Sequence, residues 1–325
     1  MIQLPKISVI VPVYNGEAHI AHCIQSLQKQ TLNDIEIICV NDGSTDSTED
    51  IIKQYQVDDP RIVYVFQKNR GAGVARNNGI ENATGDYIGF VDSDDEYADD
   101  SVLETLYNTA KEHEALICGG SWQFDDGVNQ NDNKRVFSEN RWYDYSDYQF
   151  DFGFTRFIYC KSIFNNKRIC FPQLRAFEDP VFMLRAFSEA HRFYAISKTV
   201  YHYTSSHHKD LSVENTIDYL KGLSLNLSLS YEKKYEKLHR QNYERLISTA
   251  SYFVENNLNK SNDIRMYYAL MDARNLVKID LLQEAGLEID NQISIPALDY
   301  IWNTSQRFLT SFTTKAKRKL KGTRR

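Results

Sequence analysis

The first 120 residues alternate between short apolar runs and amphipathic stretches. Apolar runs rich in β-branched residues predict strands at 7–11, 35–40, 62–67 and 87–91. Between them, apolar positions recur with helical spacing at 18–30, 47–56 and 73–82. Strands that alternate with helices are typical of a mainly parallel, doubly wound α/β sheet. Ligands of such sheets bind outside the carboxyl ends of the strands, so the residues that follow each strand are the first candidates for a site.

The second half of the chain has a different pattern. Residues 122–150 are polar and aromatic with several turn signals, and they predict an irregular loop or hairpin insertion. From Thr216 onward the apolar positions recur with helical spacing, and one predicted face carries Ile217, Leu220, Leu223, Leu227 and Tyr231. We therefore expect one domain over residues 1–215, with halves at about 1–120 and 120–215, and a helical C-terminal region over 216–325.

Composition narrows the functional classes. The five cysteines include no Cys-x-x-Cys pair, which argues against a disulfide framework and a zinc site and favours a reducing cytoplasm. We expect no signal peptide and no bilayer-spanning segment. The chain has a net charge of −6, and residues 315–325 contain seven basic and no acidic side chains, so the remainder carries −13. The acidic body argues against nucleic-acid binding, whereas the tail favours an anionic membrane surface.

The residues before this tail strengthen the membrane hypothesis. An apolar stripe at helical spacing includes Leu298, Ile301, Trp302, Leu309 and Phe312. Such a helix can lie in the interface of an anionic bilayer, which would place the protein on the inner face of the cell membrane. Alternatively, the stripe packs on the helical region and only the tail is solvated.

An acidic cluster, Asp92-Ser93-Asp94-Asp95, follows the predicted strand at 87–91. The neighbouring sequence contains no base to neutralise it. Clustered carboxylates repel one another unless they are protonated or bridged, and Mg²⁺ or Mn²⁺ prefers oxygen ligands and often shares them with a diphosphate. The cluster therefore predicts a cation site, with an acidic corner that caps the next helix as the alternative.

Two further motifs follow predicted strands. The segment 41–46, Asn-Asp-Gly-Ser-Thr-Asp, is either a turn and helix start, capped by Ser44 or Asp46, or a site where Asp42 accepts an N–H from a nucleotide base. The segment 71–76 superficially resembles a dinucleotide fingerprint, but it follows the third strand and ends in Arg76, which argues against a nicotinamide cofactor. Gly73 permits a close approach at a helix start. Arg76 either reaches a diphosphate or base or forms a surface salt bridge.

Two motifs lie in the second half of the domain. Asp179 and Pro180 are suited to the N-cap and N1 positions of a helix, yet a carboxylate fixed at a helix start also suits a general base. His207 and His208 form either a solvated pair or a source of one metal ligand.

Taken together and in order, these motifs resemble the family 2 inverting glycosyltransferases of the GT-A fold, over roughly residues 5–215. The resemblance rests on five groups of residues. They are residues 12–15 with Glu17, residues 41–46, residues 69–71 followed by 75–79, residues 85–87 followed by 92–95, and residues 177–179. It implies a catalytic base at Asp179 and a metal ligand at Asp94. It also implies that the nucleotide sugar is bound by Pro12, Tyr14, Asp42, Asn69, Arg76, Asp92 and Ser93.

One position departs from the family pattern. Many members carry Arg shortly after the Tyr-x-Tyr strand, but here Thr204 follows Tyr201-His-Tyr203, which puts a diphosphate contact from that position in doubt. His208 lies about as far after Asp179 as a metal-binding histidine does in some relatives, and we expect it to supply a metal ligand.

The sequence thus predicts an inverting enzyme dependent on Mn²⁺ or Mg²⁺. We expect it to transfer a sugar from a nucleotide-diphosphate sugar, with UDP as the expected nucleotide, to a glycan or lipid-linked acceptor in bacterial surface polysaccharide synthesis. One alternative is a sugar nucleotidyltransferase, which needs a basic, glycine-rich N-terminal loop, and residues 12–16 contain no basic residue. The other is a non-catalytic sugar-nucleotide or glycan-binding module, against which the presence of Asp94 and Asp179 speaks.

Overall fold

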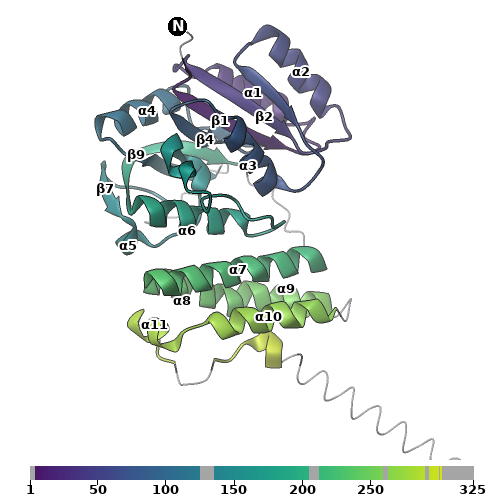
Figure 1. Ribbon diagram of the computed structural model, residues 1–325, viewed down its shortest axis with the longest axis vertical. Helices are drawn as coiled ribbons and strands as arrows, with labels where there is room; N and C mark the ends of the chain where they lie inside the picture. Colours follow the sequence, from purple (N-terminus) through teal and green to yellow (C-terminus); the bar gives the residue numbers. More distant parts are fainter. Residues whose placement is uncertain are drawn as a thin grey trace, which may run out of the picture. The chain divides into compact units, whose positions relative to one another are not determined.

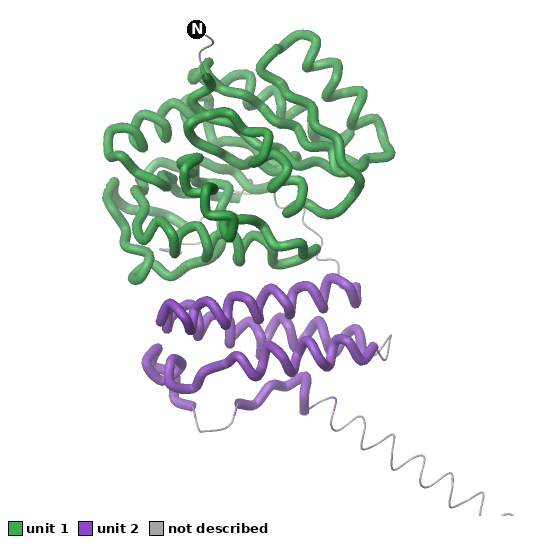
Figure 2. Tube along the Cα trace, viewed as in Figure 1, with its two compact units in different colours: residues 1–209 green, residues 210–325 purple. Residues whose placement is uncertain are grey.

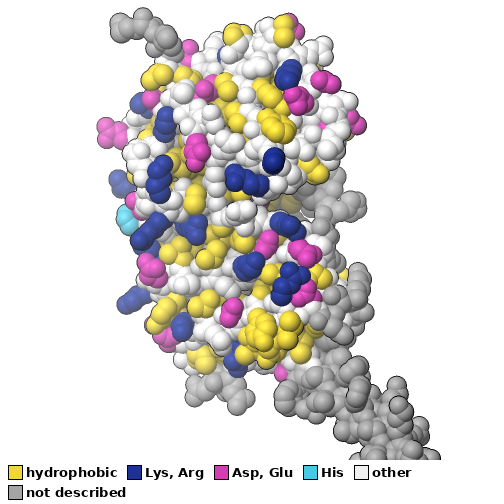
Figure 3. Space-filling model, turned by 45° about the vertical axis from the view of Figure 1, so that its right-hand side comes forward, with side chains coloured by type: hydrophobic (Ala, Val, Ile, Leu, Met, Phe, Trp, Pro, Cys, Tyr) yellow, Lys and Arg dark blue, Asp and Glu magenta, His cyan; other side chains and the backbone are white. Residues whose placement is uncertain are grey.

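The computed structural model describes residues 4–124, 135–204, 212–258, 263–289, 293–299 and 301. The chain forms two compact units, residues 1–209 and 210–325 (Figure 2). Figure 3 shows one face, on which acidic and basic side chains are interspersed with exposed hydrophobic groups. No helix within the described ranges is long and apolar enough to cross a membrane.

A nine-stranded sheet organises the first unit, with the order β3-β2-β1-β4-β8-β6-β9-β5 and β7 paired to β9 (Figure 1). The strands β1 (Ile7–Val13), β2 (Ile35–Asn41), β3 (Ile62–Phe66) and β4 (Tyr87–Phe90) are parallel. Antiparallel β8 (Phe157–Cys160) joins β4 to β6 (Ile117–Phe124). Strand β9 (Arg192–Tyr203) pairs parallel with β6 and antiparallel with β5 (Glu96–Tyr97) and β7 (Arg141–Asp144). The carboxyl ends of β1, β2, β3, β4, β6 and β9 therefore meet at one edge.

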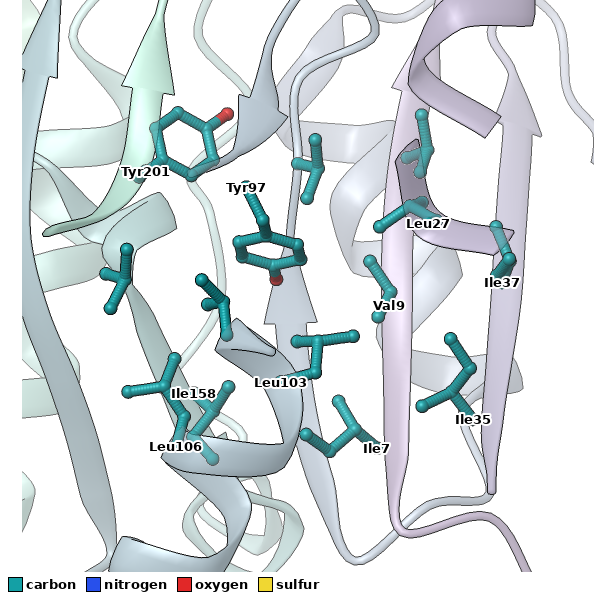
Figure 4. Close-up of a cluster of buried hydrophobic side chains, with 14 of the residues drawn as sticks. Ile7, Val9, Leu27, Ile35, Ile37, Tyr97, Leu103, Leu106, Ile158 and Tyr201 are labelled. Atoms are coloured by element: carbon teal, nitrogen blue, oxygen red, sulfur yellow. The ribbon is translucent and has the colours of Figure 1, made fainter. Parts of the chain in front are cut away.

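Helices cover both faces of the sheet. The helices α1 (Ile20–Gln28), α2 (Thr48–Asp58) and α4 (Val102–Glu112) pack on the face that carries Ile7, Val9 and Ile37 (Figure 4). On the other face, α3 (Ala72–Asn82) packs closely on Ile10, and Phe182 of α6 (Glu178–Ala190) packs on Phe90 at 5.7 Å between ring centroids. The apolar side chains of β1 point alternately to the two faces of the sheet, so they contribute to the hydrophobic core on each face.

The predicted elements of residues 7–91 are confirmed to within a few residues, but the expectation for residues 122–150 is wrong in part. Strand β6 continues to Phe124, and the segment also contains β7 and the short helix α5 (Tyr145–Tyr148). Partners distant in sequence explain the error, since both strands pair with β9. Two short 3-10 helices, η1 (Phe154–Arg156) and η2 (Lys161–Asn165), flank β8.

The second unit is helical. It comprises α7 (Val213–Lys233), α8 (Glu236–Arg245), the π-helical segment η3 (Leu246–Ala250), α9 (Ser251–Leu258), α10 (Ile264–Leu276) and α11 (Ile279–Glu284). Four members of the predicted apolar face of α7 are buried, but Tyr231 is 45% exposed. Tyr231 lies in the last turn of α7, where the ammonium of Lys278 contacts its ring at 5.3 Å.

A histidine is fully buried in this unit. The backbone N–H of Lys278 donates to Nε2 of His239 at 2.9 Å, so Nδ1 carries the proton and donates to Ser230 Oγ, also at 2.9 Å. Burial lowers the pKa of His239 to about 4. The imidazole is therefore a neutral, satisfied core group.

Candidate active site

The loops after β1 and β2 are joined by hydrogen bonds. Asn15, whose φ is 48°, donates its backbone N–H to Ser44 Oγ at 2.9 Å, and its Oδ1 accepts from the N–H of Thr45 at 2.8 Å. Of the predicted nucleotide-binding residues, Pro12 lies buried at the end of β1, and Tyr14 in the joined loops is 53% exposed. These bonds fix both residues at the carboxyl edge of the sheet.

Asp42 anchors the loop that follows β3. Its Oδ1 accepts from the N–H of Arg70 at 2.9 Å and from Gln67 Nε2 at 2.7 Å, and its Oδ2 accepts from the N–H of Gly71 at 2.8 Å. The carboxylate is 3% exposed, whereas Asn69 in the same loop is exposed. Asp42 therefore has a structural role that the sequence did not indicate, and a nucleotide base would have to share an oxygen that already accepts one bond.

Arg76 joins two segments that are distant in sequence. The side chain is 5% exposed, and its guanidinium pairs with Asp92 Oδ1 at 2.6 Å and with Glu178 Oε1 at 3.1 Å. The predicted alternative of a surface salt bridge is therefore wrong. The expectation that no base lies near the acidic cluster is also wrong, because the fold brings Arg76 from α3 to Asp92. No local sequence pattern indicated this pairing.

Gly73 makes this arrangement possible. A Cβ at this position would lie 3.0 Å from Glu178 Cγ and 3.2 Å from the carbonyl oxygen of Pro172. The first turn of α3 can therefore approach the segment before α6, as the sequence predicted.

The end of β9 clamps the turn formed by residues 92–95. Tyr201 Oη accepts from the N–H of Asp92 at 3.1 Å and donates to Asp95 Oδ2 at 2.9 Å. Thr204 donates its N–H to Asp95 Oδ1 at 2.7 Å and its hydroxyl to the carbonyl oxygen of Asp94 at 2.5 Å. Burial and the charge of Asp92 raise the pKa of Asp95 to about 7. Sequence reasoning missed this role of Asp95 and Tyr201 because β9 lies about 100 residues away.

Asp179 lies in the first turn of α6. This helix begins at Glu178, and Phe177, with a left-handed φ of 69°, occupies the N-cap position. The interpretation of Asp179 as the N-cap is therefore wrong. Burial and the charge of Glu178 raise the pKa of Asp179, while Arg76 acts in the opposite direction. A carboxyl group with a raised pKa beside a cation and a second acid is typical of a functional site.

Of the two predicted metal ligands, only Asp94 lies within the described residues. Within the described residues, no group of three or more His, Cys, Asp or Glu side chains could hold a metal ion. Asp92 pairs with Arg76, and Asp95 bonds to Tyr201 and Thr204; Ser93 and Asp94, the predicted ligand, lie partly buried in the same turn. His207 and His208 lie outside the described residues. One or two carboxylates are nevertheless a donor set that fits Mg²⁺ or Mn²⁺ when a diphosphate supplies further oxygens.

The sheet topology and the residues at its carboxyl edge define an α/β fold of the GT-A type, and the predicted fold class is confirmed. Residues 8–171 match the model of the family described as Glycosyl transferase family 2. The chain belongs to this family, as the motifs indicated.

Relatives and solved structures agree with this membership. The chain is 34% identical over 211 residues to the putative glycosyltransferase EpsH of Bacillus subtilis, an alignment that covers 62% of this chain and 61% of the relative. It is 36% identical over 206 residues to a poly(ribitol-phosphate) beta-glucosyltransferase of Bacillus spizizenii, covering 61% and 32%. The chain thus spans less than two thirds of these relatives. The structure of S. aureus TarS 1-349 in complex with UDP-GlcNAc is similar in fold, with a TM-score of 0.69, 23% identity and coverage of 85% of this chain and 82% of that one.

Proposed function

We propose that the protein transfers a sugar, with inversion, from a UDP-linked nucleotide sugar to a hydroxyl of a glycan or lipid-linked acceptor. The proposal rests mainly on one observation: the buried guanidinium of Arg76 holds two carboxylate motifs close together. Arg76 pairs with Asp92 of the acidic turn and with Glu178, the neighbour of Asp179. Both motifs lie beyond the carboxyl ends of the strands, where a nucleotide sugar would bind.

In this proposal Asp179 takes the proton of the acceptor hydroxyl as that hydroxyl attacks the anomeric carbon from the face opposite the nucleotide. Its raised pKa favours proton uptake near neutral pH. The nucleotide contacts Pro12, Tyr14 and Asn69 from the first three loops, shares Asp42, and contacts Asp92 and Ser93 beside Arg76. No covalent intermediate with the enzyme is needed.

Asp94 and His208 are the residues that would hold Mn²⁺ or Mg²⁺. A bound cation supplies charge stabilisation for the departing diphosphate. The remaining ligands would be phosphate oxygens, since Asp95 is bonded to Tyr201 and Thr204. The TarS structure with UDP-GlcNAc supports a nucleotide-sugar donor, and a mannosyltransferase structure with GDP-Man and Mn²⁺, with a TM-score of 0.54, supports a metal.

We place the acceptor in surface polysaccharide synthesis on the inner face of the membrane. A Campylobacter jejuni relative, 38% identical over 118 residues, is a GalNAc(5)-diNAcBac-PP-undecaprenol beta-1,3-glucosyltransferase, which supports a lipid-linked acceptor. The basic tail, residues 315–325, would bring the enzyme to such an acceptor.

A panel of UDP- and GDP-sugars tests the proposal. We expect one donor to be hydrolysed slowly without acceptor, only with Mn²⁺ or Mg²⁺, and transferred with inversion to a glycan, as read from the anomeric proton by NMR. Asp94→Ala should abolish this activity without lowering the melting temperature, because removal of one clustered carboxylate relieves repulsion. Wild-type activity in excess EDTA would show that the reaction needs no metal. If no donor of the panel is bound or hydrolysed, the proposal that the protein is a glycosyltransferase is wrong.

A further inference from the structure

An aromatic cluster stands at the carboxyl ends of β6 and β9. It consists of Trp122, Phe124, Phe152 and Tyr203. Trp122 is the hub, with ring centroids 5.1 Å from Phe124, 6.3 Å from Phe152 and 4.6 Å from Tyr203. Trp122 and Tyr203 are buried, Phe124 is partly buried, and Phe152 is 40% exposed. Phe152 therefore presents the exposed ring of this cluster and packs on the buried indole, while the guanidinium of Arg135 lies 5.0 Å from the ring of Trp122 and 5.6 Å from that of Phe124.

Three contacts connect this cluster to the candidate active site. The guanidinium of Arg76 lies 4.8 Å from the ring centroid of Phe154, two residues after Phe152. The hydroxyl of Thr155 bonds that of Tyr203 at 2.7 Å. The next residue, Thr204, clamps the acidic turn through Asp94. The segment that carries Phe152 thus runs between Arg76 and the end of β9.

A buried donor beside Phe152 adds a second observation. The indole N–H of Trp122 is buried, and it has no hydrogen-bond acceptor among the residues whose positions are described. It lies 3.2 Å from the position that a Cβ of Gly153 would occupy, and Gly153 has a left-handed φ of 81°. A buried donor without an acceptor destabilises the fold, because it has lost its hydrogen bond to water. A side chain at position 153 would crowd this N–H, so the glycine preserves a donor that an oxygen of a bound ligand would satisfy.

We propose that the aromatic cluster is the platform for a sugar ring of the acceptor. A pyranose has an apolar C–H face, which packs on an aromatic ring, and a rim of hydroxyl groups, which accept hydrogen bonds; sites for such ligands combine aromatic walls with a few polar groups. Phe152 supplies the exposed ring, and Trp122 supplies support and a donor. The inference rests on the proposed function and identifies the acceptor as a glycan whose ring lies beside the base, rather than a lipid phosphate alone.

Substitution of the exposed ring tests the platform. Phe152→Ala should raise the acceptor KM on the order of 10-fold, as expected for the loss of one aromatic contact of about 1.4 kcal/mol. Hydrolysis of the donor without acceptor and the Kd for UDP should remain at wild-type values. Phe152→Tyr should restore the KM because it keeps the ring. Tyr252→Ala, which removes a 58% exposed aromatic ring in the helical unit, is the matched control and should change neither constant.

Direct binding separates this inference from the proposed function. Methyl glycosides, disaccharides and trisaccharides of glucose, galactose and N-acetylglucosamine would be examined by saturation-transfer NMR with wild-type protein and with Phe152→Ala. We expect saturation of one glycan's C–H protons that is lost in the variant. Equal glycan binding or equal acceptor KM in both proteins would overturn the platform, as would a parallel loss of UDP affinity. Glycan binding that depends on Phe152 in a protein that hydrolyses no nucleotide sugar would keep the platform and reject the transferase.

Discussion

Arg76 is the residue on which the arrangement of the candidate site depends most. It neutralises one carboxylate from the turn after β4 and one from α6, and aromatic rings of Phe154 and Phe171 lie 4.8 and 5.3 Å from its guanidinium carbon. Replacement of one partner of a buried ion pair is costly because the remaining charges keep their desolvation penalty. Arg76 therefore determines both stability and the spacing of the two acidic motifs.

We predict that Arg76→Met lowers the free energy of unfolding by about 3–5 kcal/mol, measured by urea denaturation. Lys53→Met is the control, because it removes an exposed pair with Glu49 and should change stability little. A loss for Arg76→Met no greater than that of the control would show that the buried pairs do not stabilise the fold.

Asp179 allows capping to be separated from proton transfer. Since α6 begins at Glu178, Asp179→Asn should leave the melting temperature nearly unchanged. If Asp179 is the general base, the rate of sugar transfer by this variant should fall on the order of 10²-fold or more. The wild-type rate should rise with pH as the raised pKa of Asp179 is passed, because only the carboxylate accepts a proton, and the variant should lack this rise. Near-normal sugar transfer by Asp179→Asn would show that Asp179 is not the general base.

At the residue level, sequence reasoning succeeded where local pattern determines position. Asp42 and Asp92 follow apolar strands directly, so their place at the sheet edge was predictable. The partners of these residues were not predictable, because Arg76 and Tyr201 reach the acidic turn through tertiary packing. The roles of Asp94 and His208 as metal ligands stay predictions.

Among the elements, the end of β9 has a role that the sequence did not indicate. Thr204, which departs from the expected family pattern, bonds the acidic turn through both its N–H and its hydroxyl. The strands of residues 7–91 were predictable because each is a bounded apolar run. Strands β7 and β9 were not predicted at their observed lengths, since their pairing is set by register between distant segments.

We predict that Thr204→Val lowers stability by about 1 kcal/mol, the usual contribution of one hydrogen bond, and reduces the rate further than this loss explains. The reason is that the carbonyl of Asp94 loses its anchor while the backbone bond to Asp95 remains. Thr31→Val, which removes an exposed hydroxyl bond to Glu104, is the control for rate. Equal rates in the two variants at matched temperature would dismiss a positioning role for Thr204.

In the helical unit, α8 contributes the buried neutral His239. Its folded pKa is about 4 and its unfolded pKa about 6.5, so the unfolded state binds the proton first as pH falls. Stability should therefore decrease from about pH 6.5 down to pH 4, by about 3 kcal/mol from this residue. Melting curves of His239→Gln, whose amide can donate and accept, should show a smaller acid loss than wild type. Identical pH profiles would assign the acid sensitivity to other groups.

For the whole molecule, the two units differ in what the sequence could establish. The sheet of the first unit follows from its alternating pattern and family motifs, and helices were predicted for the second. The amphipathic stripe beyond residue 301 and the basic tail lie outside the described residues, so membrane attachment stays a prediction.

Deletion of residues 313–325 should abolish co-sedimentation with anionic vesicles at moderate salt and preserve transfer to a soluble acceptor. Each basic residue near the surface contributes about 1 kcal/mol of attraction, and the deletion removes all seven in the tail. Neutral vesicles provide the control. If the truncated protein binds anionic vesicles as well as the full chain, the tail is not the anchor.

The position of β9 in the sheet also has a consequence for biosynthesis. During translation the ribosome completes β1 to β4 long before residues 192–203 emerge. Until then the edge of β6 is open, and the acidic turn lacks Tyr201 and Thr204. Unpaired strand edges favour association between nascent chains. The nascent polypeptide thus acquires an ordered acidic turn and a closed sheet edge in the same late step, so it cannot display a finished site before its sheet edge is protected.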